Sequence, residues 1–227
     1  MNVGRLFEGF VSSGVAGGLA GGAASGLLVQ ALSSKKGKKM AGSALKLGGA
    51  AVVGGLAWKA YQQYQQNSAR NTEIPSAEPV TTNSWETLQK EQFLPASDTD
   101  AAYQELLILR AMISAAHADG HIDGSEKLKI FERLEQSGLS QAEKGLLMEE
   151  LSAPLPLHVL ADQARSPALA AEVYMASLIM IDQANEVNRQ YLDQLSFRLN
   201  LPPQLVSQLQ LQAAPQPGAA LAHAQVA

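Results

Sequence analysis

Residues 115–126 read AAHADGHIDGSE and interrupt a region in which apolar side chains recur every three or four positions. That recurrence is typical of helices with one buried face, so the string predicts a turn between two helices. Gly120 is suited to end the first helix, and Asp123 with Glu126 three positions later forms a cap for the second. Three carboxylates, from Asp119, Asp123 and Glu126, therefore lie close together in the sequence at this turn.

The carboxylates of this acidic turn suggest two roles. Carboxylate oxygens are the hard ligands that Ca²⁺ and Mg²⁺ prefer, so Asp119, Asp123 and Glu126 are candidate metal ligands. Helix capping alone also explains Asp123 and Glu126, and the spacing is not that of an EF-hand loop. His117 and His121 are four residues apart, as two zinc ligands on one helix can be, but the glycine between them favours an exposed pair.

Outward from the acidic turn, residues 100–212 are rich in Leu, Ala and charged residues at helical spacing. No alternation of apolar and polar residues and no hairpin signal indicates a strand, so the predicted fold class is all-α. Ser140 with Glu143 forms a capping box, and Pro167 suits the first turn of a helix. We expect one compact domain of about seven short helices, around residues 106–119, 128–138, 140–153, 157–164, 167–181, 191–199 and from 202 onward.

The helical region contains a faint internal repeat. Residues 112–114 (MIS) parallel residues 175–177 (MAS) at an offset of 63, and Gly138 parallels Asn200 at an offset of 62. Each half reads as a helix, an acidic turn and another helix, and the second turn contains Asp182. The pattern predicts a duplicated helical hairpin.

The pattern A-x-A-D-G-x-I-D-x-x-E at residues 116–126 resembles the TerB-like domain. Together with the segment LGGAAVVGGLAWKAYQQYQ at residues 47–65 and a proline-containing linker, it makes nearly the whole chain similar to the YebE-type inner-membrane proteins, a family of unknown function. The resemblance implies an all-helical TerB-like fold, association with the bacterial inner membrane, and an acidic metal site of the tellurite-resistance TerB type. The residues that match this site are Asp119, Asp123, Glu126 and Asp182.

The second acidic turn departs from the family pattern. Ala184 stands where the family has a second Asp, and Asn188 stands where it has a Glu. Because Ca²⁺ takes about six to eight oxygen ligands, the loss of two carboxylates predicts weak binding of a divalent cation, or an apo structural variant. Asn185 and Glu186 compensate for the loss only if the register of the turn shifts.

Residues 10–32 form 23 consecutive positions without a charge, in which Gly14, Gly18, Gly22 and Gly26 recur every four residues. On a helix this spacing draws a stripe of small residues. Interior glycines cost roughly 1 kcal/mol each in water, whereas a bilayer forces the backbone into a helix and lets such stripes pack closely. A helix of this length rises about 34 Å, enough for a hydrocarbon core of about 30 Å. We expect a membrane span that packs against a second copy or a partner helix through the stripe.

The charged positions around the apolar region predict its orientation. Lys35, Lys36, Lys38 and Lys39 follow the first stretch and favour the cytoplasmic side, where they can also bind anionic lipid head groups. A second apolar stretch, residues 40–58, is a candidate partner span. One span places the helical domain in the cytoplasm, which we favour, and a hairpin places both ends outside. A cleaved signal peptide and a soluble, disordered arm are the alternatives.

The chain thus divides into an apolar N-terminal region, a linker, the helical domain and a tail. The linker is polar and contains three prolines, and the low complexity of the tail favours disorder. The predicted bounds are residues 1–66, 67–99, 100–212 and 213–227.

Composition and motifs exclude several classes of function. The chain has no cysteine, which rules out disulfides, cysteine-ligated metals and thiol catalysis. A formal net charge of −4 argues against nucleic-acid binding. The sequence also lacks a motif that combines a nucleophile with a base, so it gives no indication of an enzyme. We predict a non-enzymatic, membrane-anchored TerB-like interaction module, sensitive to a divalent cation such as Ca²⁺ or Mg²⁺, that acts in an envelope or metal-stress context. The alternative is a soluble metal-binding or sensing domain with a disordered N-terminal arm.

Overall fold

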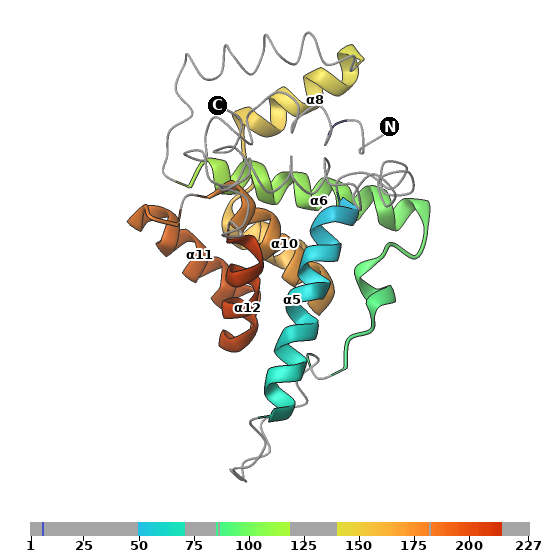
Figure 1. The fold of residues 1–227 in the computed structure, drawn as a ribbon. Coiled ribbons are helices and arrows are strands. Elements are labelled where there is room, and N and C mark those ends of the chain that lie inside the picture. The colour runs from blue at the N-terminus through green and yellow to red at the C-terminus, as the bar shows by residue number, and fades with distance from the viewer. Residues whose placement is uncertain are drawn as a thin grey trace, which may run out of the picture.

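The computed structural model describes residue 6 and residues 50–70, 85, 87–118, 140–181 and 183–214. Within these ranges the chain forms seven α-helices, one 3-10 helix and no strand, which confirms the all-α prediction. Helix α10 is central, with α6 lying across it and α5 and α12 packed beside it (Figure 1). The elements are α5 (Ala50–Arg70), η1 (Lys90–Phe93), α6 (Asp98–Ala116), α8 (Gln141–Ser152), α9 (Leu157–Gln163), α10 (Pro167–Met180), α11 (Glu186–Arg198) and α12 (Pro203–Ala213).

Helix α10 is buried along almost its whole length. Its sequence, PALAAEVYMASLIM, has no polar face, and twelve of its fourteen residues are buried. A helix that is apolar on every side is stable only when other elements surround it. The Ser166 side chain accepts a hydrogen bond from the Leu169 N–H, and Pro167 occupies the first turn, as predicted. The serine cap and the proline favour the start of the helix at this position. The apolar residues of the helix are then buried against the surrounding helices.

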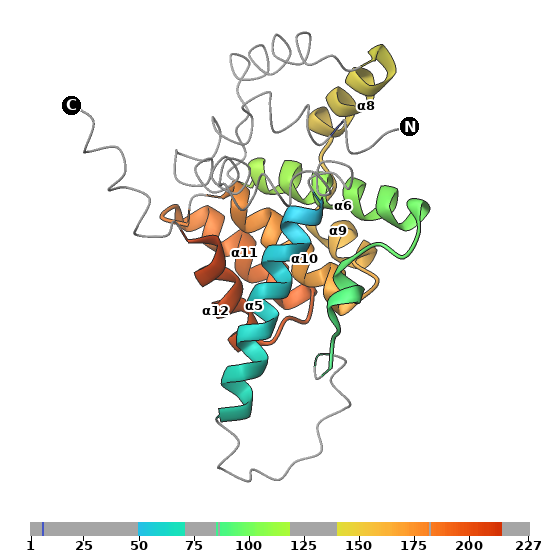
Figure 2. The ribbon, with the colours of Figure 1, turned by 45° about the vertical axis from the view of Figure 1, so that its right-hand side comes forward.

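Most of the predicted helices are found close to their expected positions. At α8 the Ser140 N–H donates to Glu143 Oε2 over 2.9 Å and the Glu143 N–H donates to Ser140 Oγ over 3.3 Å, which confirms the capping box. Helix α8 extends away from the other described helices, above α6 in Figures 1 and 2. The helix predicted around residues 128–138 lies outside the described residues.

Helix α5 brings residues 50–70 into the core, although the sequence placed the start of the domain at residue 100. Val53, Ala57, Ala60 and Tyr61 are fully buried, and α5 packs along α12 and α10. Residues 50–58, the second half of the candidate span 40–58, therefore contribute to the helical core, and its first half lies outside the described residues. Among the helices that the structure describes, none has the length and apolar content needed to cross a bilayer.

The segment before α6 is fastened to α5 through one tyrosine. The Tyr61 hydroxyl donates to the Trp85 carbonyl and accepts from the Leu88 N–H, both over 2.8 Å. Trp85, Leu88 and Phe93 are buried, although the sequence indicated a linker here. Their spacing is irregular and matches neither a helix nor a strand, so periodicity could not reveal that they join the core.

The described residues at the two ends of the chain also reach this core. Leu6 is fully buried and belongs to the same hydrophobic cluster as α5 and α10. At the other end, Ala213 is a buried residue of α12. The remainder of the predicted tail, residues 215–227, lies outside the described residues.

Candidate functional site

Both predicted acidic turns follow helices that pack against each other. Helix α6 ends at Ala116 and α10 ends at Met180, and these two helices form the most extensive contact between any described pair. The predicted metal ligands themselves, Asp119, Asp123, Glu126 and Asp182, lie outside the described residues. The same holds for the glycines of the stripe and for the lysine cluster, namely Gly14, Gly18, Gly22, Gly26, Lys35, Lys36, Lys38 and Lys39.

Tyr191 of α11 connects the helices that lead to the two turns. Its hydroxyl donates to Ser114 Oγ over 3.2 Å, and the Ser114 hydroxyl donates to the Leu155 carbonyl over 3.0 Å. Burial raises the pKa of Tyr191, while hydrogen bonds to the side chains of Ser114 and Ser177 lower it. Ser114 and Ser177 are equivalent positions of the sequence repeat, so the two halves of the repeat meet at one tyrosine.

The described part of the second turn is held by an arginine. Arg189 Nη1 donates to the carbonyls of Gln183 and Ala184, each over 3.0 Å, and the guanidinium pairs with the Glu186 carboxylate. This pairing, with a hydrogen bond from Gln190, lowers the pKa of Glu186. Arg189 therefore supplies a positive charge to two carbonyls of the turn and to Glu186, one of the residues considered as a substitute ligand.

Asn185, the other residue considered as a substitute ligand, is also engaged within the turn. Its Oδ1 accepts from the Val187 N–H over 2.9 Å and caps α11. Asn188 is buried. Among the residues that the structure describes, no group of three or more His, Asp or Glu side chains could hold a metal ion. In the described half of the second turn, Asn185 and Glu186 are therefore both engaged with other groups of the turn.

A buried carboxyl group in α10 was missed by the sequence analysis. Glu172 is 0% exposed, and Gln104 Nε2 of α6 donates to its Oε2 over 2.5 Å. Burial raises the pKa of Glu172 to about 8, and the hydrogen bond from Gln104 acts in the opposite direction. One signal could have revealed it, because Glu172 is the single charged residue in the apolar stretch 167–181.

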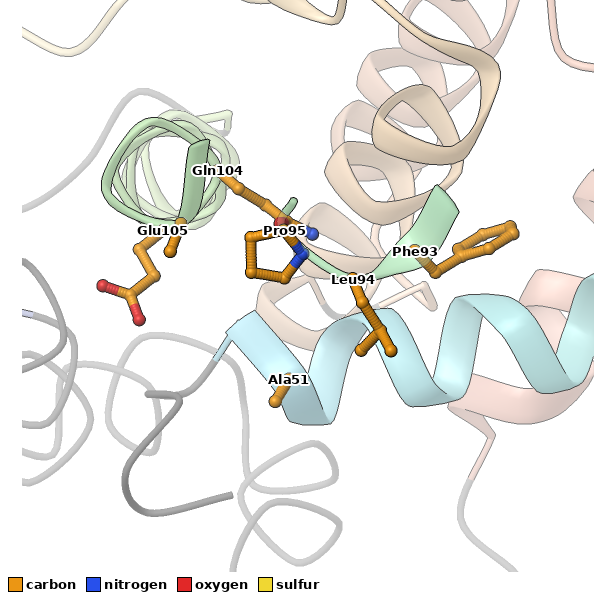
Figure 3. Close-up of a pocket in the computed structure, with 7 residues that line it drawn as sticks. Ala51, Phe93, Leu94, Pro95, Gln104 and Glu105 are labelled. Carbon is orange, nitrogen blue, oxygen red and sulfur yellow. The ribbon is translucent and has the colours of Figure 1, made fainter. Parts of the chain in front are cut away.

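The pockets near these polar groups are small or open. Figure 3 shows the one at the junction of α5, α6 and the Phe93–Pro95 segment, with a volume of about 10 Å³, enough for one water molecule. Gln104 and Phe93 line it, and the Glu105 carboxyl points away from Gln104. A second pocket, of about 250 Å³, lies between α5 and α12 and is lined by Tyr64, Asn67, Ser68, Gln204 and Gln208.

Comparisons with known proteins place the chain in a family. Residues 16–213 match the family described as "Protein of unknown function (DUF533)". Over 95 residues the chain is 28% identical to the "Uncharacterized protein in ampR 5'region" of Yersinia enterocolitica, an alignment that covers 42% of this chain and 68% of that protein. No solved structure matches the chain significantly. Because the family match spans most of the 227 residues, the chain belongs to the DUF533 family.

Proposed function

We propose that this protein is a non-enzymatic interaction module with a TerB-like helical domain, anchored at the cytoplasmic face of the bacterial inner membrane. Residues 10–32 enter the bilayer, and the helical domain presents its surface to a protein partner. The observation that carries the proposal is the position of α5 in the helical core. Because α5 begins at residue 50, only residues 33–49 lie between this helix and the apolar stretch, a distance of at most about 60 Å.

The burial of Leu6 supports a particular form of anchoring. Leu6 and Val53 belong to the same core, so described residues on both sides of the apolar stretch lie at the domain. We infer that residues 10–32 form a re-entrant segment, which enters the bilayer and leaves it again on the same side as the helical domain. The lysine cluster at residues 35–39 then lies against the head groups on this side, which the preference of lysine for the cytoplasmic flank assigns to the cytoplasm.

The described surface suits binding better than catalysis. Gln104 binds one carboxyl oxygen of the buried Glu172, and the pocket that Gln104 lines has room for about one water. Phe197 at the end of α11 is 83% exposed, and an exposed aromatic side chain is a typical anchor for a protein partner. Sensitivity to a divalent cation is confined in this proposal to the first acidic turn, because in the second turn Arg189 already binds the Gln183 and Ala184 carbonyls.

Membrane extraction tests the anchor. The full-length chain should remain in the pellet after carbonate washing of bacterial membranes, and a variant that lacks residues 10–32 should move to the supernatant while keeping its helical circular dichroism. The variant Gly18→Ile should lose crosslinked dimers that Gly18→Ala retains, if the stripe mediates self-association. A full-length chain that stays in aqueous solution as a monomer without detergent contradicts the anchor and favours the soluble metal-binding alternative.

Cysteine labelling tests whether residues 10–32 enter and leave the bilayer on the same side, since the native chain has no cysteine. Single cysteines at Asn2, Ser34 and Ser207 can be probed with an impermeant maleimide in intact and lysed spheroplasts. All three should react only after lysis. Labelling of Asn2→Cys alone in intact cells indicates a single crossing, and labelling of Ser207→Cys in intact cells places the domain outside the cytoplasm.

A further inference from the structure

Glu172 lies at a point where three elements of the fold meet. It is fully buried in the middle of α10, and Gln104 of α6 binds one of its carboxyl oxygens over 2.5 Å. The other oxygen, Oε1, has no hydrogen-bond partner among the described residues. A buried carboxylate with an unsatisfied oxygen is unfavourable, so this environment favours the protonated, uncharged form.

Helix α5 separates this oxygen from water. A Cβ atom built on Gly54 would lie 3.0 Å from Glu172 Oε1 and 2.9 Å from the Phe93 carbonyl oxygen. Gly54 thus lets the backbone of α5 approach Glu172 and η1 more closely than any other residue would. Movement of α5 away from α10 would therefore remove the backbone that lies against Oε1.

Among the described residues, no basic side chain lies near Glu172 to neutralise the negative charge of an ionised carboxylate. Facing it are the side chain of Gln104 from α6, the backbone of Gly54 from α5 and, beyond Gly54, the Phe93 carbonyl from η1. Glu105, next to Gln104 on α6, is acidic, and burial raises its pKa as well. The basic residues of these elements whose side chains the structure describes lie elsewhere: Lys59 and Lys90 are exposed, and Arg110 pairs with Glu150.

We propose that Glu172 is a proton-binding site that couples the docking of α5 to pH: the protonated carboxyl holds α5 on α10, and loss of the proton to water releases α5. The docked state binds the proton more tightly than the released state, in which the carboxyl is hydrated. Linkage then requires that the equilibrium constant for release increase about tenfold per pH unit, from about pH 5 until the docked carboxyl itself ionises near pH 8.

Release of α5 would also affect the N-terminal region of the chain. Helix α5 is the described helix that follows residues 1–49 in the sequence, so its release would remove one attachment of the N-terminal region to the helical domain. The inference does not depend on the proposed membrane anchor, because it concerns only contacts within the core.

Hydrogen exchange of the full-length chain tests the proposal. Protection of the α5 amides, corrected for the intrinsic pH dependence of exchange, should fall about tenfold per pH unit between about pH 5 and pH 8. The amides of α8 should show no such slope. Trp58 and Trp85, the two tryptophans of the chain, lie on α5 and on the segment bound to it, so acrylamide should quench their fluorescence more strongly as the pH rises.

Variants distinguish ionisation of the Glu172 carboxyl from other causes of a pH-dependent α5 protection. Glu172→Gln keeps the shape and cannot ionise, so its α5 protection should not depend on pH. The matched control Glu149→Gln, at an exposed glutamate of α8, should behave as the wild type. In Gln104→Met the loss of the hydrogen bond raises the pKa of Glu172 further, so the tenfold decline should continue to higher pH.

Three results would overturn the proposal. One is wild-type α5 protection that does not change with pH, which can be read even if Glu172→Gln fails to fold. Another is an unchanged slope in a folded Glu172→Gln protein. The third is a parallel loss of protection in α5 and α8, which indicates global unfolding instead of release of one helix.

Discussion

Gly54 approaches Glu172 so closely that a Cβ atom at position 54 would lie 3.0 Å from Glu172 Oε1. The same atom would lie 2.9 Å from the Phe93 carbonyl oxygen, a backbone atom that cannot rotate away. The neighbouring Gly55 has nothing within 4 Å of its hypothetical Cβ. The two adjacent glycines of α5 therefore have different roles, one in close packing of helices and the other at the surface.

This difference predicts opposite effects of the same substitution. Gly54→Ala should destabilise the fold by roughly 1–3 kcal/mol, because α5 must shift away from η1 and α10. Gly55→Ala should stabilise it by up to about 1 kcal/mol, because alanine favours a helix and meets no neighbour. Urea unfolding followed by circular dichroism measures both free energies. Equal values for the two variants would show that α5 does not dock at Gly54.

Tyr61→Phe should release the segment before α6. The hydroxyl accepts from the Leu88 N–H and from Gln65 Nε2 and donates to the Trp85 carbonyl, so its removal leaves buried polar groups unsatisfied, at a cost of roughly 1–3 kcal/mol. We expect faster proteolysis within residues 85–97 and faster amide exchange at Leu88. Tyr64→Phe is the control, because this side chain borders the open pocket between α5 and α12. A Tyr61→Phe variant as resistant to protease as the control would contradict the role of the hydroxyl.

The helix layout could largely be predicted from the sequence because it depends on local signals. Ser140 with Glu143 and Pro167 begin helices where expected. Asn200 follows α11 with a φ of 52°, a left-handed conformation that favours glycine, and the sequence repeat aligns it with Gly138, which lies outside the described residues. The fold class and most helix bounds follow from such features.

The docking of α5 and the buried Glu172 depend on contacts between distant residues. The Gly54-Gly55 pair carries no sequence signal that distinguishes its two members. Only the structure shows that Gly54 faces a carboxyl 118 positions later in the sequence, while Gly55 faces open space. Likewise, Gln104 and Glu172 are 68 residues apart, and neither has a motif around it. The predicted metal ligands lie outside the described residues, so they stay predictions, and only the flanks of their turns can be compared.

The attachment of α8 should depend on one ion pair. Arg110 Nε and Nη2 donate to Glu150 Oε1 over 2.8 and 2.5 Å, and the two side chains are 26% and 10% exposed. Glu150→Gln should cost roughly 1–3 kcal/mol, because a partly buried guanidinium loses its charged partner. Amide exchange should accelerate in α8 more than in α10, with Glu149→Gln as the exposed control. Equal acceleration in the two helices would mean that the pair stabilises the whole domain instead.

Arg189→Met should change how the second turn responds to pH and to cations. Because Arg189 lowers the pKa of Glu186, the pairing stabilises the turn above the ordinary pKa of the carboxyl and is lost as the pH falls through the lowered value. The variant should raise the Glu186 pKa, measured by carboxyl ¹³C NMR, and should free the Gln183 and Ala184 carbonyls. Millimolar Ca²⁺ should then shift the signals of this turn in the variant and leave them unchanged in the wild type. Arg198→Met, at the other end of α11, controls for the loss of one charge, and a Ca²⁺ response of the wild-type turn would show that the guanidinium does not replace a metal there.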